Sequence, residues 1–131
     1  MKMRGVAAVA VACALAIAAC STQGNSGAST SVSLEGTSPG NPTVGGTIYS
    51  GTCTACHRGD LSGINGLGKP LAPSAFIAGM SEIDLATFIA AGRSTDDPTN
   101  TTGVDMPPKG GNTSLSAQDL RDVAAFLKTQ Q

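Results

Sequence analysis

The residues with the clearest chemistry in this chain are the five consecutive ones from Cys53 to His57, which read C-T-A-C-H. Two thiols three residues apart lie on one face of a helical turn. Cys53 and Cys56 can therefore bond covalently to the vinyl groups at one edge of a haem, while the imidazole of His57 ligates the iron. The same residues also allow two other interpretations, a redox-active thiol pair and part of a zinc site.

Zinc is disfavoured by the small number of possible ligands. A structural zinc site needs four, and a lone C-x-x-C-H motif offers at most three. His57 is the single histidine of the chain, and the two other cysteines, Cys13 and Cys20, lie in or next to an expected export signal. For the same reason we do not expect a disulfide scaffold.

A haem iron held by His57 has a second axial position to fill, and methionine is a common ligand there. Two methionines, Met80 and Met106, remain once the expected signal is removed. Met80 precedes a predicted helix, where it can serve as a hydrophobic staple. Met106 lies in a segment without helical periodicity and is followed by Pro107 and Pro108, which stiffen the backbone around a weak thioether ligand. We therefore predict that Met106 is the second ligand.

The elements that must position these residues read as helices. A first helix is expected from about Val44 through Cys56, with Tyr49 on the face that carries the thiols. Gly45 and Gly46 are costly inside a helix, which indicates a close approach by another backbone. From 58 to 73 the chain is rich in glycine and proline and is expected to be a loop. Its carbonyls are natural acceptors for the second ring N–H of His57, and the candidate acceptor is Pro70.

Two further helices announce their starts with the same pattern. Ser81 and Ser116 are predicted N-caps, each with an aspartate three residues later and a flanking pair of apolar residues. The first of these helices should end at Gly92, and the second runs to the end of the chain. With no alternating strand pattern, we expect an all-α domain of three to four helices. The missing βαβ pattern also disfavours a thiol-disulfide enzyme.

The N-terminus is typical of an exported protein. Residues 1–19 combine Lys2 and Arg4 with an apolar run that is too short for a comfortable membrane span. The run ends in Ile17-Ala18-Ala19-Cys20, which resembles the lipobox of bacterial lipoproteins and implies acylation of Cys20. Ordinary cleavage after Ala18 is the alternative. We expect residues 20–42 to be a lipid-anchored flexible tether and residues 43–131 to be the folded domain.

Charge adds one exclusion. The chain carries eight basic and nine acidic residues, for a net charge of −1. It has no Lys/Arg cluster and no basic stripe with interleaved aromatic residues, so nucleic-acid binding is not expected. The expected partners are redox proteins, themselves associated with a membrane.

The domain resembles a class I c-type cytochrome of the small bacterial type. The matching features are the G-x-x-x-Y pattern from Gly45 to Tyr49, the C-T-A-C-H motif, a Gly/Pro loop ending near Pro70, a helix closing at Gly92-Arg93, the Met106-Pro107-Pro108 segment and a last helix with Phe126. The resemblance implies the small cytochrome c fold around one haem c. It also implies that the first and last helices cross, with Gly45 and Tyr49 near Phe126. One departure is Lys69, where the family often has a small residue or proline.

That resemblance implies an electron carrier rather than an enzyme, because His57 and Met106 would fill both axial positions of the iron. We expect Arg93 to pair with a haem propionate, with an ordinary surface arginine as the alternative, and Lys109 to replace Met106 at high pH. The lipobox-like signal implies the bacterial cell envelope, with the protein anchored to the outer or inner membrane and facing the periplasm. Two alternatives stay open: a thiol-disulfide oxidoreductase that uses Cys53 and Cys56, and a haem sensor or peroxidase in which Met106 dissociates.

Overall fold

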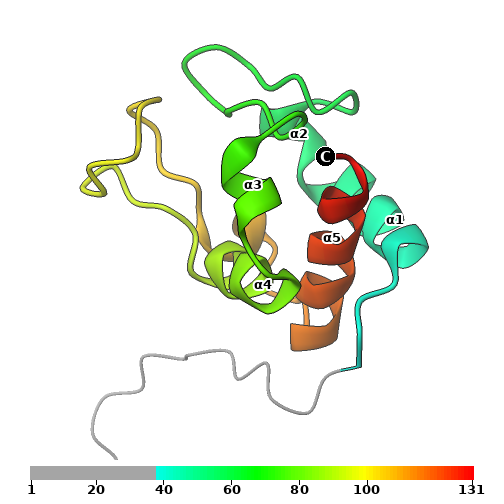
Figure 1. Cartoon of the computed structure of the whole chain (residues 1–131). Coiled ribbons are helices and arrows are strands. Elements are labelled where there is room, and N and C mark those ends of the chain that lie inside the picture. The colour runs from blue at the N-terminus through cyan, green and yellow to red at the C-terminus, as the bar shows by residue number, and fades with distance from the viewer. Residues whose placement is uncertain (1–37) are drawn as a thin grey trace, which may run out of the picture.

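The computed structural model describes residues 38–131, which contain five α-helices, one 3₁₀ helix and no strand (Figure 1). The elements are α1 (Pro42–Thr52), α2 (Thr54–His57), α3 (Ala75–Gly79), α4 (Glu82–Ala91), the 3₁₀ helix η1 (Pro108–Gly111) and α5 (Ala117–Thr129). The all-α prediction is confirmed. The predicted first helix is divided into α1 and the four-residue α2, and α3 is an additional helix of five residues. The predicted signal, Cys20 and most of the predicted tether lie outside the described residues.

The fold is centred on the crossing of α1 and α5. Gly45 is buried against the backbone of Asp122 in α5, and a methyl group at position 45 would collide with that carbonyl. Next to this contact, the ring centroids of Tyr49 and Phe126 lie 5.3 Å apart. The close backbone approach predicted from the glycines is therefore confirmed, and α5 is the partner.

Helix α5 also packs against α4, so it lies between two helices (Figure 1). Ser116 and Asp119 form the reciprocal capping box that starts α5, as predicted. Its buried face supplies five of the twelve buried hydrophobic residues among those described, and the large, fully buried side chains of the core are Tyr49, Leu85, Leu120 and Val123. The core is built from few aromatic residues, as the composition requires.

The start of α1 differs from the prediction by two residues. Asn41 caps the helix by accepting hydrogen bonds from the amides of Thr43 and Val44, and Pro42 occupies the first turn. The amide of Asn41 in turn donates to the buried carboxylate of Asp122 at 2.8 Å, and the amide of Gly40 donates to Glu82 at 2.9 Å. These bonds fasten the last residues of the predicted tether to α5 and α4.

Helix α4 begins and ends as predicted. Ser81 caps it by accepting from the amide of Asp84, and Gly92 ends it with a φ of 72°. That positive φ reverses the chain and brings Gly92 against the backbone of Met106 and Pro107, so closely that a side chain at position 92 would collide with it. The end of α4 is thus tied directly to the segment that carries Met106.

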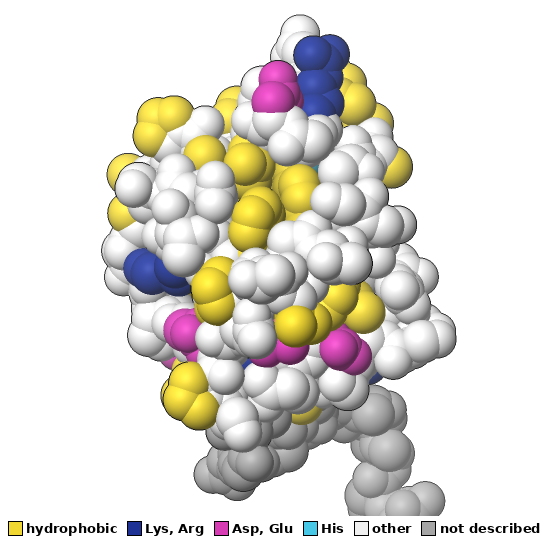
Figure 2. All heavy atoms as spheres, turned by 90° about the vertical axis from the view of Figure 1, so that its right-hand side faces the viewer, with side chains coloured by type: hydrophobic (Ala, Val, Ile, Leu, Met, Phe, Trp, Pro, Cys, Tyr) yellow, Lys and Arg dark blue, Asp and Glu magenta, His cyan; other side chains and the backbone are white. Residues whose placement is uncertain are grey.

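No helix among the described residues is both long enough and apolar enough to span a membrane. On the face shown in Figure 2, apolar side chains gather near the centre, and acidic and basic side chains are scattered around them in small groups.

Candidate functional site

The C-T-A-C-H motif lies where α1 passes into α2. Cys53 is the residue between the two helices, and its φ and ψ of −96° and −22° keep the helical direction. The amide of Cys53 donates to Tyr49 and that of His57 donates to Cys53, so helical hydrogen bonding continues through the motif. At Arg58, φ turns to 60° and the helix ends. The predicted helix is therefore present as α1 and α2, joined at Cys53, and it holds both cysteines and His57 on one segment.

The loop of residues 58–73 folds back over α2 and supplies the acceptor for His57. Gly68 packs on the carbonyl of Cys56 so closely that a larger residue would collide with it. One residue later, the carbonyl of Lys69 lies 2.8 Å from Nδ1 of His57. The prediction that Pro70 supplies this carbonyl was wrong by one residue. Pro70 follows the acceptor and restricts its conformation.

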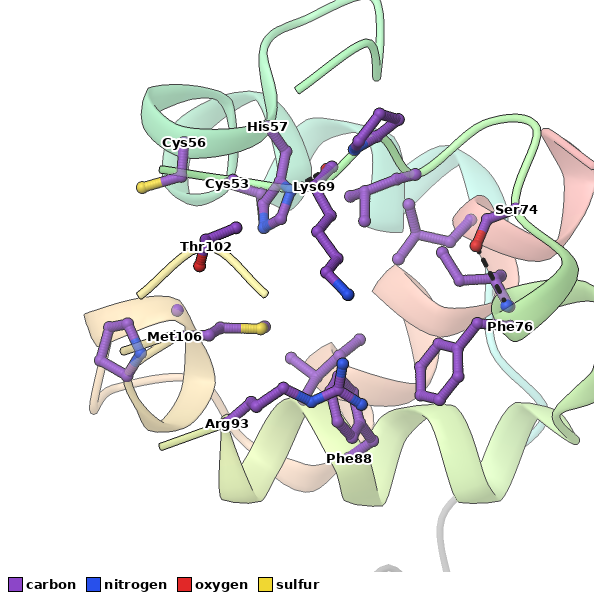
Figure 3. A pocket seen from close by; sticks show the side chains of 18 of the residues that line it. Cys53, Cys56, His57, Lys69, Ser74, Phe76, Phe88, Arg93, Thr102 and Met106 are labelled. Atoms are coloured by element: carbon purple, nitrogen blue, oxygen red, sulfur yellow. Dashed lines mark hydrogen bonds between the residues drawn. The ribbon is translucent and has the colours of Figure 1, made fainter. Parts of the chain in front are cut away.

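This hydrogen bond decides which nitrogen of His57 carries the proton. A backbone carbonyl can only accept, so Nδ1 must be the donor. In the neutral ring, Nε2 then keeps its lone pair, the state required of a metal ligand. Figure 3 shows the ring of His57 directed into a cavity.

Met106 reaches the same cavity from a different wall (Figure 3). Its amide donates to the carbonyl of Arg93 at 2.9 Å and its carbonyl accepts from the amide of Arg93 at 2.8 Å. This two-way pairing fixes the backbone at Met106 to the end of α4. Met80, the alternative, packs against the core and does not line the cavity.

The cavity itself is about 330 Å³, and residues of all five α-helices line it. Cys53, Cys56, His57 and Met106 all line it, together with core side chains such as Leu85, Ile89 and Val123. Exposed lining residues, among them Leu67 and Val104, carry it to the surface. The structure thus brings together all four residues predicted to hold the haem and surrounds them with apolar side chains.

Arg93 also reaches into the cavity (Figure 3). Its guanidinium lies over the rings of Phe88 and Phe76, 4.6 and 5.0 Å from their centroids. Its Nε is 3.3 Å from a carboxylate oxygen of Asp97. That contact lacks hydrogen-bond geometry, so within the described chain the buried Nε has no hydrogen-bond partner. A partly buried cation whose Nε makes no hydrogen bond, directed into an apolar cavity, fits a site that receives an anionic group.

The thiol of Cys53 differs from the attacking thiol of a redox enzyme. Burial, with a smaller contribution from Cys56, raises the pKa of Cys53 to about 11. An attacking cysteine in a thiol-disulfide enzyme needs the opposite shift, because the thiolate is the nucleophile. No disulfide links Cys53 to Cys56 in the described chain.

The family model for cytochrome c matches residues 43–131. The chain belongs to the cytochrome c family. No curated protein matches the chain. Covalently attached haem c is therefore the cofactor of this cytochrome, and its general activity is haem-based electron transfer. The residues on the cavity wall fit that group: two thiols, an imidazole with a free lone pair and a thioether.

Two side chains of this cytochrome have surroundings that the sequence did not predict. Lys69 supplies the carbonyl for His57, and its own ammonium reaches 3.1 Å from the carbonyl of Thr99, in the segment before Met106. The available signal was the neighbouring Pro70, read one residue too late. Lys109 was expected to compete with Met106, but its ammonium donates to Leu115 at 2.7 Å and does not line the cavity. The geometry therefore does not support that role for Lys109.

Proposed function

We propose that this cytochrome is a one-electron carrier whose iron is ligated by His57 and Met106 and which is held at a membrane by a lipid on Cys20. The observation that carries the axial assignment is the cavity, to which both side chains reach from different walls (Figure 3). The protonated Nδ1 of His57, bonded to Lys69, leaves Nε2 for the metal.

With both axial positions filled by protein, the bound haem supplies reversible exchange between Fe(II) and Fe(III) and no open position for a substrate. The protein's own contribution is to exclude water with the apolar wall and to hold the two ligands on short, hydrogen-bonded segments. Methionine as the second ligand favours the reduced state relative to most other ligands. An electron then enters and leaves at the edge of the cavity that reaches the surface.

Arg93 is proposed to neutralise a haem propionate. The support is its partial burial, the missing hydrogen bond at its Nε and its position on the cavity wall. Asp97, which faces the same guanidinium, would then share it with the propionate. Arg93→Met keeps the apolar stem over the phenylalanine rings. It should lower the reduction potential, because the negative charge of the propionate is then no longer neutralised and favours Fe(III) over Fe(II).

The experiment for the haem assignment is a visible spectrum of the purified protein before and after extraction with acidic acetone. Covalent haem keeps its Soret and α bands with the protein through extraction, and a loss of both bands contradicts the proposal. Carbon monoxide added to the ferrous protein distinguishes the second candidate. A carrier with Met106 bound resists it, whereas tight binding favours a sensor or peroxidase with a displaceable Met106.

Membrane tethering rests on the lipobox-like Ile17–Cys20 segment and the polar sequence that follows it. A flexible tether would raise the effective concentration of the carrier near membrane-bound redox partners. The proposed location is the bacterial envelope, on the periplasmic side of the outer or inner membrane. Fractionation of cells that produce Cys20→Ser tests this. The variant should become soluble, and if it stays wholly in the membrane fraction the lipid anchor is refuted.

A further inference from the structure

The loop of residues 94–105 contains no helix, and it leads directly to the proposed ligand Met106. In Figure 1 it projects from the helical body as a yellow trace. Its base is closed by the two-way hydrogen bonding of Arg93 with Met106, at 2.8 and 2.9 Å. A thioether is a weak ligand, so its occupancy depends on how firmly the backbone holds it over the iron. The shape of this loop therefore matters to the site.

Asn100 joins the two sides of the loop. Its Nδ2 donates to the carbonyl of Ser94 at 3.1 Å and to that of Val104 at 2.8 Å. Ser94 directly follows Arg93, and Val104 lies two residues before Met106. One amide nitrogen thus bridges the two sides of the loop, next to the Arg93–Met106 pair that closes it.

The amide oxygen of the same side chain holds the side of the loop that leads to Met106. Its Oδ1 accepts from the amide of Thr102 at 3.1 Å, from the hydroxyl of Thr102 at 3.0 Å and from the amide of Gly103 at 3.2 Å. The amide nitrogen and the amide oxygen of Asn100 are therefore both engaged, which requires a side chain that donates and accepts at once. Asn100 and Thr102 also line the cavity beside Met106.

We propose that Asn100 is a positioning residue for Met106: it holds the 94–105 loop in the one shape that keeps the thioether on the iron. This rests on the proposed ligation by Met106 and names the residue that maintains it. Asp105, which accepts from the amide of Thr95 at 2.5 Å, supports the same base from the side. It does not span the loop interior.

The test uses the full-length ferric protein and its near-infrared Met–Fe band, followed as pH is raised. Asn100→Asp keeps the shape and the acceptor and removes both donors. Losing two hydrogen bonds should favour the released state by roughly tenfold or more, so the band should disappear at a pH lower by about one unit or more. Carbon monoxide should bind the ferrous variant at least about tenfold faster.

Two controls separate positioning from stability. Asn65→Asp makes the same chemical change in an exposed loop residue and should leave both measurements unchanged. Ser116→Ala removes the cap of α5, away from the loop, and lowers global stability. It should lower the unfolding midpoint without moving the Met–Fe transition.

Asn100→Ala provides a second variant that removes every bond of the side chain. If both Asn100 variants lose the band at the same pH midpoint as the unmodified protein, and bind carbon monoxide within twofold of its rate, the positioning role is refuted while ligation by Met106 stands. If the unmodified protein itself lacks the band, ligation by Met106 is refuted and the role of Asn100 falls with it.

Discussion

Replacing Gly45 by alanine tests the packing that places the haem motif. Gly45 lies inside α1, where alanine is intrinsically better by about 1 kcal/mol. Its added methyl group, however, would meet the carbonyl of Asp122 and the amide of Val123 in α5. Both are backbone atoms of α5 at the helix crossing, so neither can yield without moving that helix.

Gly51 is the matched control, because it lies in the same helix with nothing within 4 Å of the added methyl group. Gly51→Ala should therefore gain about 1 kcal/mol of stability from helix propensity alone. Gly45→Ala gains the same amount and loses about 3 kcal/mol or more by overpacking against a rigid partner. The difference between the two variants should be about 3 kcal/mol.

Urea unfolding of the haem-bearing protein, followed by far-ultraviolet circular dichroism, measures this difference. With a slope of about 1–2 kcal/mol/M, the two midpoints should differ by about 1.5–3 M. Gly45→Ala should unfold first, below the unmodified protein. If Gly45→Ala is as stable as Gly51→Ala, the α1–α5 contact is not tight and the packing argument fails.

Three further predictions concern single contacts. Burial, with smaller contributions from Cys53 and Asp60, raises the pKa of Tyr49 from 10.0 to about 12, so the folded protein keeps a proton that the unfolded chain loses and stability falls as pH rises from about 10 to 12. Ultraviolet titration of this single tyrosine should show a midpoint near 12; ionisation near pH 10 in the folded state would contradict it. Gly68→Ala should push the loop off the Cys56 carbonyl and lower Tm by several degrees, whereas Gly59→Ala, with open space around it, should leave Tm unchanged; equal Tm values would refute the contact. Lys69→Ala should leave the ring N–H of His57 in slow exchange by NMR, because its acceptor is main chain; rapid exchange would show that the bond is lost.

The helices could be predicted because their signals are local. Ser81, Ser116 and Gly92 act on amides and carbonyls within a few residues, so cap and stop residues specify α4 and α5 wherever they lie in space. The C-T-A-C-H motif is local in the same sense. The start of α1 was placed two residues late because the Asn41-Pro42 signal was assigned to the tether.

What the sequence could not supply were contacts between distant segments. The acceptor for His57 comes from Lys69 because Gly68 fits closely over Cys56, which depends on the path of a whole loop. The network around Asn100 likewise forms only where the two sides of the 94–105 loop meet. Neither leaves a periodic pattern, so both require the three-dimensional arrangement.

The central claim is that His57 and Met106 both ligate a covalently bound haem. The most direct measurement is the near-infrared Met–Fe band of the purified ferric protein, compared with Met106→Ala and with Met80→Ala as the matched control. The account predicts the band in the unmodified protein and in Met80→Ala, and its loss in Met106→Ala. A band that survives Met106→Ala, or one that disappears in Met80→Ala alone, would contradict it.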